Sequence, residues 1–197
     1  MDRNKLLDDF LKAWPLKKLS SMTLDQYTNL NASDSFCFWL ESKTSELGSI
    51  WGGSAYKFQI YKWRETPTRG NGYLSDDDYA WNSKQGNTAN EVFEKVRAAV
   101  CEIVTNAAAG NFTAIDGIDV FGEVCKWKIA FLYSHKQLIP IYNRDMLEAV
   151  AAKQGIKVSK NMPTSEIHRE LIKKMDNQDL FEYYDDLLDS ISYSKDV

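Results

Sequence analysis

The chain has 197 residues, of which 44% are hydrophobic and 26% charged, and its formal net charge is −4. This size and composition indicate a folded globular protein and argue against a disordered chain or a uniformly cationic nucleic-acid binder. No apolar run approaches the roughly 18–20 residues that a helix needs to cross a bilayer, so we expect a cytoplasmic protein with no membrane partner.

The first thirty residues predict two helices. Apolar residues recur at helical spacing near the N-terminus: Leu6, Leu7, Phe10, Leu11 and Trp14. Pro15 ends this helix because proline cannot continue it. A second short helix is expected over Leu24–Leu30, where the hydroxyl of Thr23 can cap the first turn.

Three β-strands are expected next. Aromatic and β-branched runs over Ser35–Ser42 and Tyr56–Trp63 predict two strands, and Tyr79–Lys84 predicts a weaker third. The polar stretch Arg64–Asp78 lies before the third strand and is predicted to be an exposed loop.

The remainder of the chain is predicted to be mostly helical. Asn87 or Thr88 caps a long helix that Gly110 ends, because the apolar residues between them lie three or four apart. Further helices are expected over Gly122–Ser134, Arg144–Gln154, Ser165–Met175 with Thr164 as its cap, and Leu180–Tyr193. The predicted fold class is α+β, with a small, mostly antiparallel sheet of about three or more strands, several packed helices and a helical C-terminal half. We expect one domain over residues 1–160 and a helical extension over 161–197.

The stretch GSIWGGSAYKFQIYKW, from Gly48 to Trp63, raises the question of a phosphate-binding loop. Such a loop ends in Gly-Lys-Ser/Thr at the start of a helix, so that backbone N–H groups and the lysine meet the phosphates. Here the double glycine is followed by Ser54 and then by a predicted strand. We therefore interpret the glycines as a turn and expect this segment not to hydrolyse nucleotides.

The predicted strand Tyr56–Trp63 has two chemically different faces. Alternation places Tyr56, Phe58 and Ile60 on one face, which has the composition of a core. The other face carries Lys57, Gln59, Tyr61 and Trp63, and Trp39 of the preceding strand can join it. Cations beside large aromatics suit a surface that contacts phosphates and stacks bases. The alternative is that helices cover both sides of the sheet and bury these aromatics as ordinary core.

A nuclease site is a further alternative. Glu41 and Lys43 form a Glu-x-Lys pair at the end of the first predicted strand, and Asp25 or Asp34 could supply the second carboxylate. Two carboxylates that hold Mg²⁺ and a lysine near the attacking water would form such a site. The competing interpretation is a solvated strand end.

Cysteine and histidine usage gives no metal or cofactor site. Cys37, Cys101 and Cys125 are far apart and lie among apolar neighbours, which indicates reduced thiols in the core. The chain has only two histidines and no CxxC pair, so we expect no zinc and no other cofactor.

Charge is distributed unevenly along the chain. Five basic and two acidic residues lie between Lys43 and Tyr73, whereas one basic and seven acidic residues lie between Asp176 and Val197. One surface can therefore attract a polyanion while the C-terminal segment repels it.

Three phrases of the sequence carry a family resemblance. They are FLKAWPLKKLSSMTLDQYTNL, DSFCFWLESKTSELGSIWGGSAYKFQIYKW and KWKIAFLYSHKQLIPIYNRDML, and together they span most of residues 6–150. These phrases resemble the N-terminal region ahead of the motor in some bacterial McrB-type AAA+ GTPases. Those proteins are the DNA-recognising, nucleotide-hydrolysing subunits of modification-dependent restriction systems.

The resemblance implies a non-catalytic DNA-recognition module, with a methylated or otherwise modified base as one target class and with the motor beyond Val197. Cleavage would come from a separate nuclease subunit of the McrC type. The aromatic and basic residues of the β-rich block are then the candidate DNA contacts, as base stackers or as phosphate ligands. The stackers are Trp39, Trp51, Tyr61 and Trp63, and the phosphate ligands are Lys57, Lys62, Arg64 and Arg69. The runner-up is an assembly domain of the same system that docks through the acidic helix Asp176–Asp196.

Overall fold

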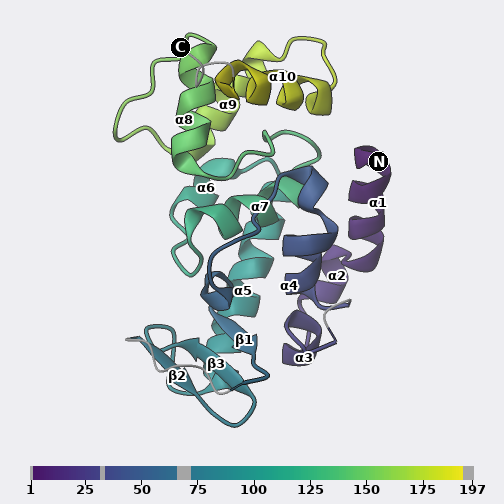
Figure 1. Cartoon of the computed structure of the whole chain (residues 1–197), viewed down its shortest axis with the longest axis vertical. Helices are drawn as coiled ribbons and strands as arrows, with labels where there is room; N and C mark the ends of the chain where they lie inside the picture. The colour runs from purple at the N-terminus through teal and green to yellow at the C-terminus, as the bar shows by residue number, and fades with distance from the viewer. Residues whose placement is uncertain (1, 32–33, 66–71, 193–197) are drawn as a thin grey trace.

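The computed structural model describes residues 2–31, 34–65 and 72–192. A three-stranded sheet lies at one end of the molecule, and α8, α9 and α10 lie at the other (Figure 1). Between them, α5 packs against α7, and the N-terminal helices lie along one side of this pair. The α+β fold with a small antiparallel sheet and a helical C-terminal half is as predicted.

The bounds of the elements are as follows. The N-terminal part holds α1 (Arg3–Ala13), α2 (Leu16–Leu19), α3 (Leu24–Tyr27), α4 (Phe36–Phe38), a π-helical turn (Trp39–Lys43) and 3-10 turns at Ser45–Leu47 and Ala55–Phe58. The strands are β1 (Ile60–Lys62), β2 (Tyr73–Ser75) and β3 (Tyr79–Asn82). The later helices are α5 (Ala89–Ala108), α6 (Phe112–Asp116), α7 (Glu123–Tyr133), α8 (Arg144–Lys153), α9 (Thr164–Lys174) and α10 (Leu180–Ser192).

The strongest periodic patterns gave correct helices. Helix α1 ends just before Pro15, and Thr23 forms a capping box at the start of α3, although α3 ends at Tyr27 and not at Leu30 as predicted. The side chain of Thr88 accepts a hydrogen bond from the Glu91 amide at the start of α5. The valines and isoleucines of α5 lie on its buried face, so burial of one apolar stripe explains the length of this helix.

The predicted strand Ser35–Ser42 is wrong, because this segment is helical. The side chain of Ser35 accepts a hydrogen bond from the Phe38 amide, and a π-helical turn continues the chain to Lys43. The ring of Phe36 packs against Trp14 and Tyr27 and is fully buried. A short apolar run that is buried on several sides has no period to distinguish a strand from a helix.

The predicted strand Tyr56–Trp63 is only partly correct. Its first half is the 3-10 turn Ala55–Phe58, and Gln59 has a left-handed conformation with φ of 68°, so β1 begins at Ile60. The third predicted strand is confirmed as β3, although it ends at Asn82. Strand β2 lies within the stretch that was predicted to be an exposed loop.

Strand β3 is the centre of the sheet, whose order is β1-β3-β2. Ile60 and Leu74 both pair with Trp81, so these three side chains share one face. Ile60 and Trp81 are buried in the same apolar cluster as the helices. The opposite face carries Tyr61 and is only partly covered.

The helices beyond residue 160 pack onto the rest of the chain. Leu180, Phe181 and Leu187 of α10 belong to the same buried cluster as α5 and α7. The guanidinium of Arg3 lies 2.8 Å from the carboxylate of Asp185, which joins α1 to α10. None of the helices in the described part of the chain has both the length and the apolar character needed to cross a membrane.

Two smaller sequence predictions concern single side chains. The three cysteines are free thiols, as predicted, but only Cys37 and Cys125 are buried, whereas Cys101 is half-buried at the edge of the core. Thr164, however, does not cap α9: Pro163 holds the cap position, and the Thr164 hydroxyl contacts other helices instead.

Candidate functional site

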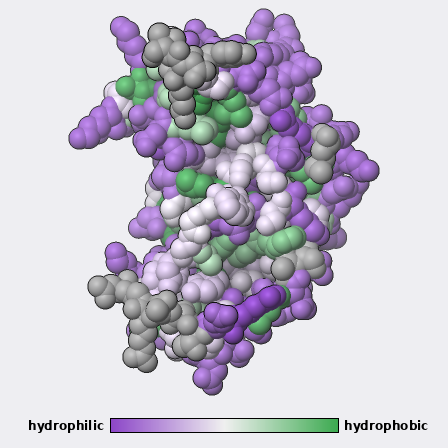
Figure 2. All heavy atoms as spheres, viewed as in Figure 1, coloured by the Kyte–Doolittle hydropathy of each residue, from purple (hydrophilic) through white to green (hydrophobic). Residues whose placement is uncertain are grey.

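The segment Gly48–Ser54, which we call the Trp51 loop, presents the most exposed large apolar side chain of the described residues. The side chain of Trp51 is 80% exposed. Gly52 and Gly53 have positive φ values of 102° and 71°, and a Cβ at either position would meet open space. Figure 2 shows side chains of near-neutral hydropathy across the middle of the viewed face, where Figure 1 draws the chain between α4 and β1.

A buried lysine holds the beginning of the Trp51 loop. Lys128 of α7 has no exposed surface, and its Nζ donates hydrogen bonds to the carbonyl oxygens of Thr44, Leu47 and Gly48 at 2.7, 3.2 and 2.6 Å. Burial lowers the pKa of Lys128, whereas three carbonyl acceptors match the three N–H groups of the ammonium form. The lysine thereby satisfies three backbone carbonyls that are buried with it.

Gly48 lies against the chain that precedes α8. Its φ is 85°, and a Cβ here would overlap the carbonyl oxygen of Pro140 and lie 2.7 Å from the ring of Tyr142. The hydroxyl of Tyr142 donates to the carbonyl of Leu47 at 2.5 Å. Only glycine fits this position, so close packing as well as hydrogen bonding fixes the loop.

A second lysine holds the tip of the Trp51 loop. Lys57 forms an ion pair with Glu41, and its Nζ also donates to the carbonyls of Ile50 at 2.8 Å and Gly52 at 3.1 Å. These two residues stand on either side of Trp51 in the sequence. The backbone on both sides of the exposed indole is therefore bound to one ammonium group.

A pocket of about 390 Å³ opens beside the exposed indole. It is lined by the Trp51 loop together with Lys57, Val124 of α7 and Asn143, the N-cap residue of α8. The side-chain oxygen of Asn143 accepts the Met146 amide at 3.0 Å. The pocket thus combines an aromatic wall, an aliphatic side chain and an amide.

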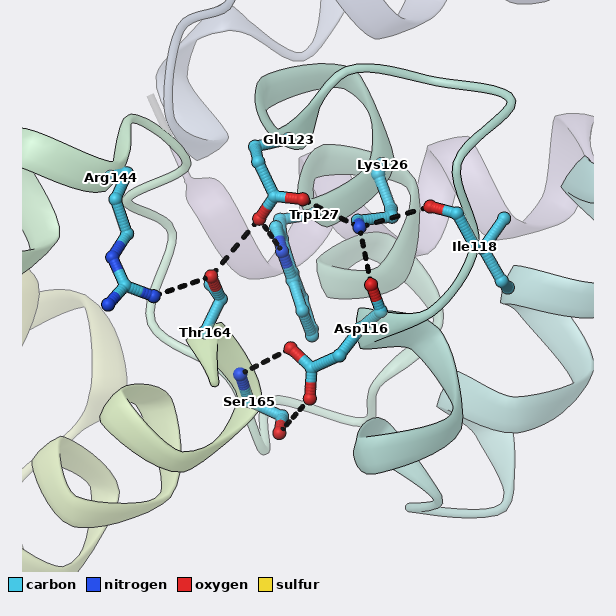
Figure 3. Close-up of polar contacts among 8 residues, drawn as sticks. All are labelled: Asp116, Ile118, Glu123, Lys126, Trp127, Arg144, Thr164 and Ser165. Carbon is cyan, nitrogen blue, oxygen red and sulfur yellow. Dashed lines mark hydrogen bonds and ion pairs between the residues drawn. The ribbon is translucent and has the colours of Figure 1, made fainter. Parts of the chain in front are cut away.

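A polar network behind the pocket joins the first turns of α7, α8 and α9 (Figure 3). The Thr164 hydroxyl donates to the Glu123 carboxylate at 3.1 Å and accepts from Arg144 at 3.0 Å. Lys126 and Trp127 donate to the same carboxylate at 2.6 and 2.9 Å. Burial opposes the charge on Glu123, but these hydrogen bonds outweigh the effect of burial and lower the pKa of the Glu123 carboxyl group.

Two residues that line the pocket, Val124 and Asn143, are next to members of this network in the sequence. The network therefore fixes the far wall of the pocket.

The same network continues to α6. The amide and hydroxyl of Ser165 both bind the Asp116 carboxylate, and Lys126 donates to the carbonyls of Asp116 and Ile118 at 3.1 Å each (Figure 3). Its donors and acceptors pair with one another, so we assign the network a structural role.

The sheet face that carries Tyr61 holds a cluster of three tyrosines. The rings of Tyr56 and Tyr73 stack with their centroids 3.5 Å apart, and Tyr56 meets Tyr61 edge-on at 5.5 Å. Burial, and then the hydrogen bond to Tyr56, raise the pKa of Tyr61 to about 12. The tyrosines therefore contact one another, which leaves only part of each ring free to meet a ligand.

Two other predicted aromatics, Trp39 and Trp63, are each half-buried. Trp39 is half-buried against Phe10 of α1, with Lys43 above its ring at 4.2 Å. Trp63 is half-buried, and its indole nitrogen has no hydrogen-bond partner among the described residues. The expectation that Trp39 extends the strand surface fails because its segment is helical.

The predicted cations are dispersed as well. Lys62 lies on the sheet face opposite Tyr61, 4.0 Å from Asp78 and over the ring of Tyr79. Arg64 is exposed and donates to the carbonyl of Leu30 at 2.7 Å. Arg69 lies outside the described residues.

The geometry expected for a nuclease site is absent from the described residues. Glu41 and Lys43 lie in the π-helical turn and not at the end of a strand. Glu41 binds Lys57, and Lys43 covers Trp39. Across residues 2–31, 34–65 and 72–192, no three histidine, cysteine, aspartate or glutamate side chains gather as a metal site.

Sequence reasoning missed Lys128, although a signal was present. This lysine interrupts the apolar run of α7, and a charged residue buried on all sides must find hydrogen-bond partners. The carbonyls that Lys128 binds lie some 80 residues away in the sequence, and no local pattern predicts them.

No known protein family, curated protein or solved structure matches this chain.

Proposed function

We propose that this chain is a non-catalytic DNA-recognition module of a McrB-like restriction system that reads its target, including a modified base, through the Trp51 loop. Nucleotide hydrolysis would belong to the motor of the parent protein, and cleavage to a nuclease subunit of the McrC type. The observation that carries the proposal is the 80% exposure of Trp51 on a loop whose carbonyls are bound by two lysines.

The exposed indole gives the fold almost no burial energy. A tryptophan stabilises a protein mainly by removing its large apolar surface from water, and Trp51 leaves most of that surface in water. The loop is nevertheless held by Lys57 and Lys128. A loop that is already ordered loses less conformational entropy when it binds, which favours recognition as the role of this segment.

The chemistry beside Trp51 suits a nucleobase. Every base offers a flat face to an aromatic ring, and such stacking contributes about 1–3 kcal/mol per base. The adjacent pocket of about 390 Å³ is within the size range of small-molecule sites. A base that leaves the duplex stack could enter it between the indole and Asn143.

The test is a binding titration with fluorescently labelled duplexes that are either unmodified or cytosine-methylated. Trp51→Ala should weaken binding about 5- to 150-fold, the equivalent of one lost stacking contact. It should change the free energy of unfolding by less than about 0.5 kcal/mol, because the ring packs against little. Affinity should also fall as salt rises, as for any protein that binds phosphates.

Leu74→Ala is the matched control, since Leu74 is a 43% exposed apolar residue on the sheet. Its affinity should equal that of the wild type. The proposal fails if the wild type binds neither duplex, or if Trp51→Ala binds as tightly as the wild type.

A second candidate function is assembly with the nuclease subunit, which one observation favours. Exposed carboxylates follow one another along one side of α10 at helical spacing: Glu182, Asp185, Asp186 and Asp189. A basic partner surface would be attracted to this side. Reversal of Glu182 and Asp189 to lysine should abolish co-purification with the nuclease subunit and leave DNA binding intact. Unchanged co-purification would remove this candidate.

A further inference from the structure

We propose that Lys57 and Glu41 are a positioning pair that fixes the exposed indole of Trp51, and that Lys57 does not contact phosphate. This inference rests on the proposed function, because it assigns a role within the same binding loop. It revises the sequence-based expectation that Lys57 is a phosphate ligand, and it gives Glu41 a role other than metal binding.

All three hydrogen-bond donors of the Lys57 ammonium are already used within the protein. A lysine ammonium has three N–H groups. In the structure, Nζ of Lys57 has three oxygen partners: the carboxylate of Glu41 and the carbonyls of Ile50 and Gly52. No donor is left over, so Lys57 can bind a phosphate only by releasing a carbonyl of the loop or its own counter-ion.

The two carbonyls that Lys57 binds lie on either side of Trp51. Ile50 is buried and Gly52 is exposed, so Lys57 ties the tip of the loop to its buried side. Gly52 and Gly53 have a wide range of accessible backbone angles, which would leave the tip mobile without such a contact. The binding of both flanking carbonyls fixes the direction in which the Trp51 side chain leaves the backbone.

The ion pair between Lys57 and Glu41 is mostly shielded from water. The side chains of Lys57 and Glu41 are only 17% and 29% exposed. An ion pair that is mostly shielded from water is less screened by salt than a surface pair. Lys57 and Glu41 can therefore stay paired at the salt concentrations at which phosphate contacts weaken.

Salt dependence separates a positioning lysine from a phosphate ligand. The logarithm of DNA affinity falls with the logarithm of salt concentration, with a slope of about 0.9 for each phosphate that is neutralised. Lys57→Met should lower affinity and leave this slope unchanged. A decrease of about one unit in the slope would instead identify Lys57 as a phosphate ligand and overturn the inference.

Glu41→Gln should change DNA affinity in opposite directions for the two possible roles of Lys57. If Lys57 positions the loop, loss of its counter-ion loosens the loop and weakens binding. If Lys57 binds phosphate, the same substitution frees the ammonium and strengthens binding. Tighter binding by Glu41→Gln would therefore contradict the inference.

A double-substitution cycle shows whether the pair acts through the indole. With Trp51 present, Lys57→Met should weaken binding by at most the factor that Trp51→Ala produces. In the Trp51→Ala background, Lys57→Met should cause no further loss, because the group that it positions is gone. Equal losses in both backgrounds would show that Lys57 acts independently of Trp51.

A measurement without DNA keeps this inference separate from the proposed function. The chain is labelled with 5-fluorotryptophan, and the Trp51 signal among the six tryptophans is assigned as the one that Trp51→Phe lacks. Lys57→Met and Glu41→Gln should each narrow this fluorine resonance, because the indole of a loosened loop moves faster than the protein tumbles. If the wild type does not bind DNA, the proposed function fails, and this spectrum still decides the role of the pair. A Trp51 signal unchanged in both variants would overturn it.

The control pair is Lys173 and Glu170, which form an ion pair on α9 away from the loop. Lys173→Met and Glu170→Gln remove the same charges as the test variants. Neither should alter the fluorine signal of Trp51 or the DNA affinity, and a change as large as that of Lys57→Met would contradict a specific role for Lys57.

Discussion

The Trp51 loop and the turn Asp76–Asp78 are held in opposite ways. In the turn, the Asp76 carboxylate accepts the amides of Asp78 and Tyr79 at 2.9 and 2.7 Å, so its own residues satisfy its backbone. In the Trp51 loop, the carbonyls are bound by Lys57 and Lys128, and Lys128 is 80 residues away from Gly48. One turn is specified locally, whereas the other is built by the folded protein around an exposed ring.

This difference suggests what each segment is for. A turn that closes a hairpin needs only its local hydrogen bonds. The Trp51 loop exposes an aromatic ring, and its carbonyls bind two lysines that are partly or fully buried. Exposing the ring and burying these charged groups costs free energy that folding alone does not require. We interpret the loop as a pre-organised recognition element and the turn as a connection between β2 and β3.

The largest expected effect is that of Lys128→Met. The substitution leaves the buried carbonyl of Gly48 without a donor and removes one of two donors from the carbonyls of Thr44 and Leu47. The free energy of unfolding should therefore fall by about 3–5 kcal/mol in urea titrations. Lys12→Met is the control, because the Lys12 side chain is 78% exposed and its loss should cost less than about 0.5 kcal/mol. If the two variants were equally stable, the loop would not depend on Lys128.

The next largest effect should separate two glycines of the same loop. Gly48→Ala introduces a Cβ against Pro140 and Tyr142 at a positive φ, and should cost about 2–4 kcal/mol in thermal or urea unfolding. Gly53→Ala, at a positive φ but in open space, should cost about 1 kcal/mol. Equal costs would mean that the loop does not pack against the segment before α8.

An effect of intermediate size on the free energy of unfolding is expected when the pH is lowered. It arises from His168, which binds the segment against which Gly48 packs. Nδ1 of His168 accepts the Ile139 amide at 3.2 Å, next to Pro140. Burial, against a smaller opposing effect of Glu123, lowers the pKa of His168 from 6.5 to about 3. The unfolded chain therefore binds more protons below pH 6.5, and stability should fall by about 2 kcal/mol between pH 7 and pH 5.

Urea titrations at the two pH values check this pH dependence. His168→Gln retains an acceptor for the Ile139 amide but has no ionisable group, so it should lose most of the acid sensitivity in this range. A variant as acid-sensitive as the wild type would show that another group is responsible.

The smallest effect should be that of Asp76→Ala, which tests the turn that is held by its own residues. Loss of the two hydrogen bonds accepted by the carboxylate should cost about 1 kcal/mol in the free energy of unfolding. DNA affinity and its salt slope should be unchanged, because this turn is separate from the proposed site. A loss of affinity similar to that of Trp51→Ala would place the turn in the binding surface.

The sequence predicted the elements that have a local cause. The apolar stripe of α5, the stop at Pro15 and the N-cap at Thr23 depend on neighbouring residues, and all three are confirmed. The prediction of a strand over Ser35–Ser42 was wrong because a segment that is buried on several sides has no apolar periodicity. Contacts with rings that are distant in the sequence decide its structure. The α+β class could thus be predicted, while the helix in place of the first strand could not.

The candidate site was predictable only in its composition. Trp51 and Lys57 were both predicted as candidate DNA contacts, because the glycines and aromatics of this stretch are conspicuous, but Lys57 was predicted as a phosphate ligand and not as a support of the loop. The pairing of Lys57 with Glu41 and the role of Lys128 depend on the packing of the π-helical turn and α7 against the loop. Such long-range contacts have no signature in a single sequence.

The central claim is that the Trp51 loop is ordered before it binds anything. Backbone ¹⁵N relaxation of the free protein tests it most directly, through the order parameters of Trp51 and Gly52. We expect order parameters of about 0.85 in the wild type, as in the helices, and below about 0.6 in Lys57→Met. Values already below about 0.6 in the free wild type would contradict it.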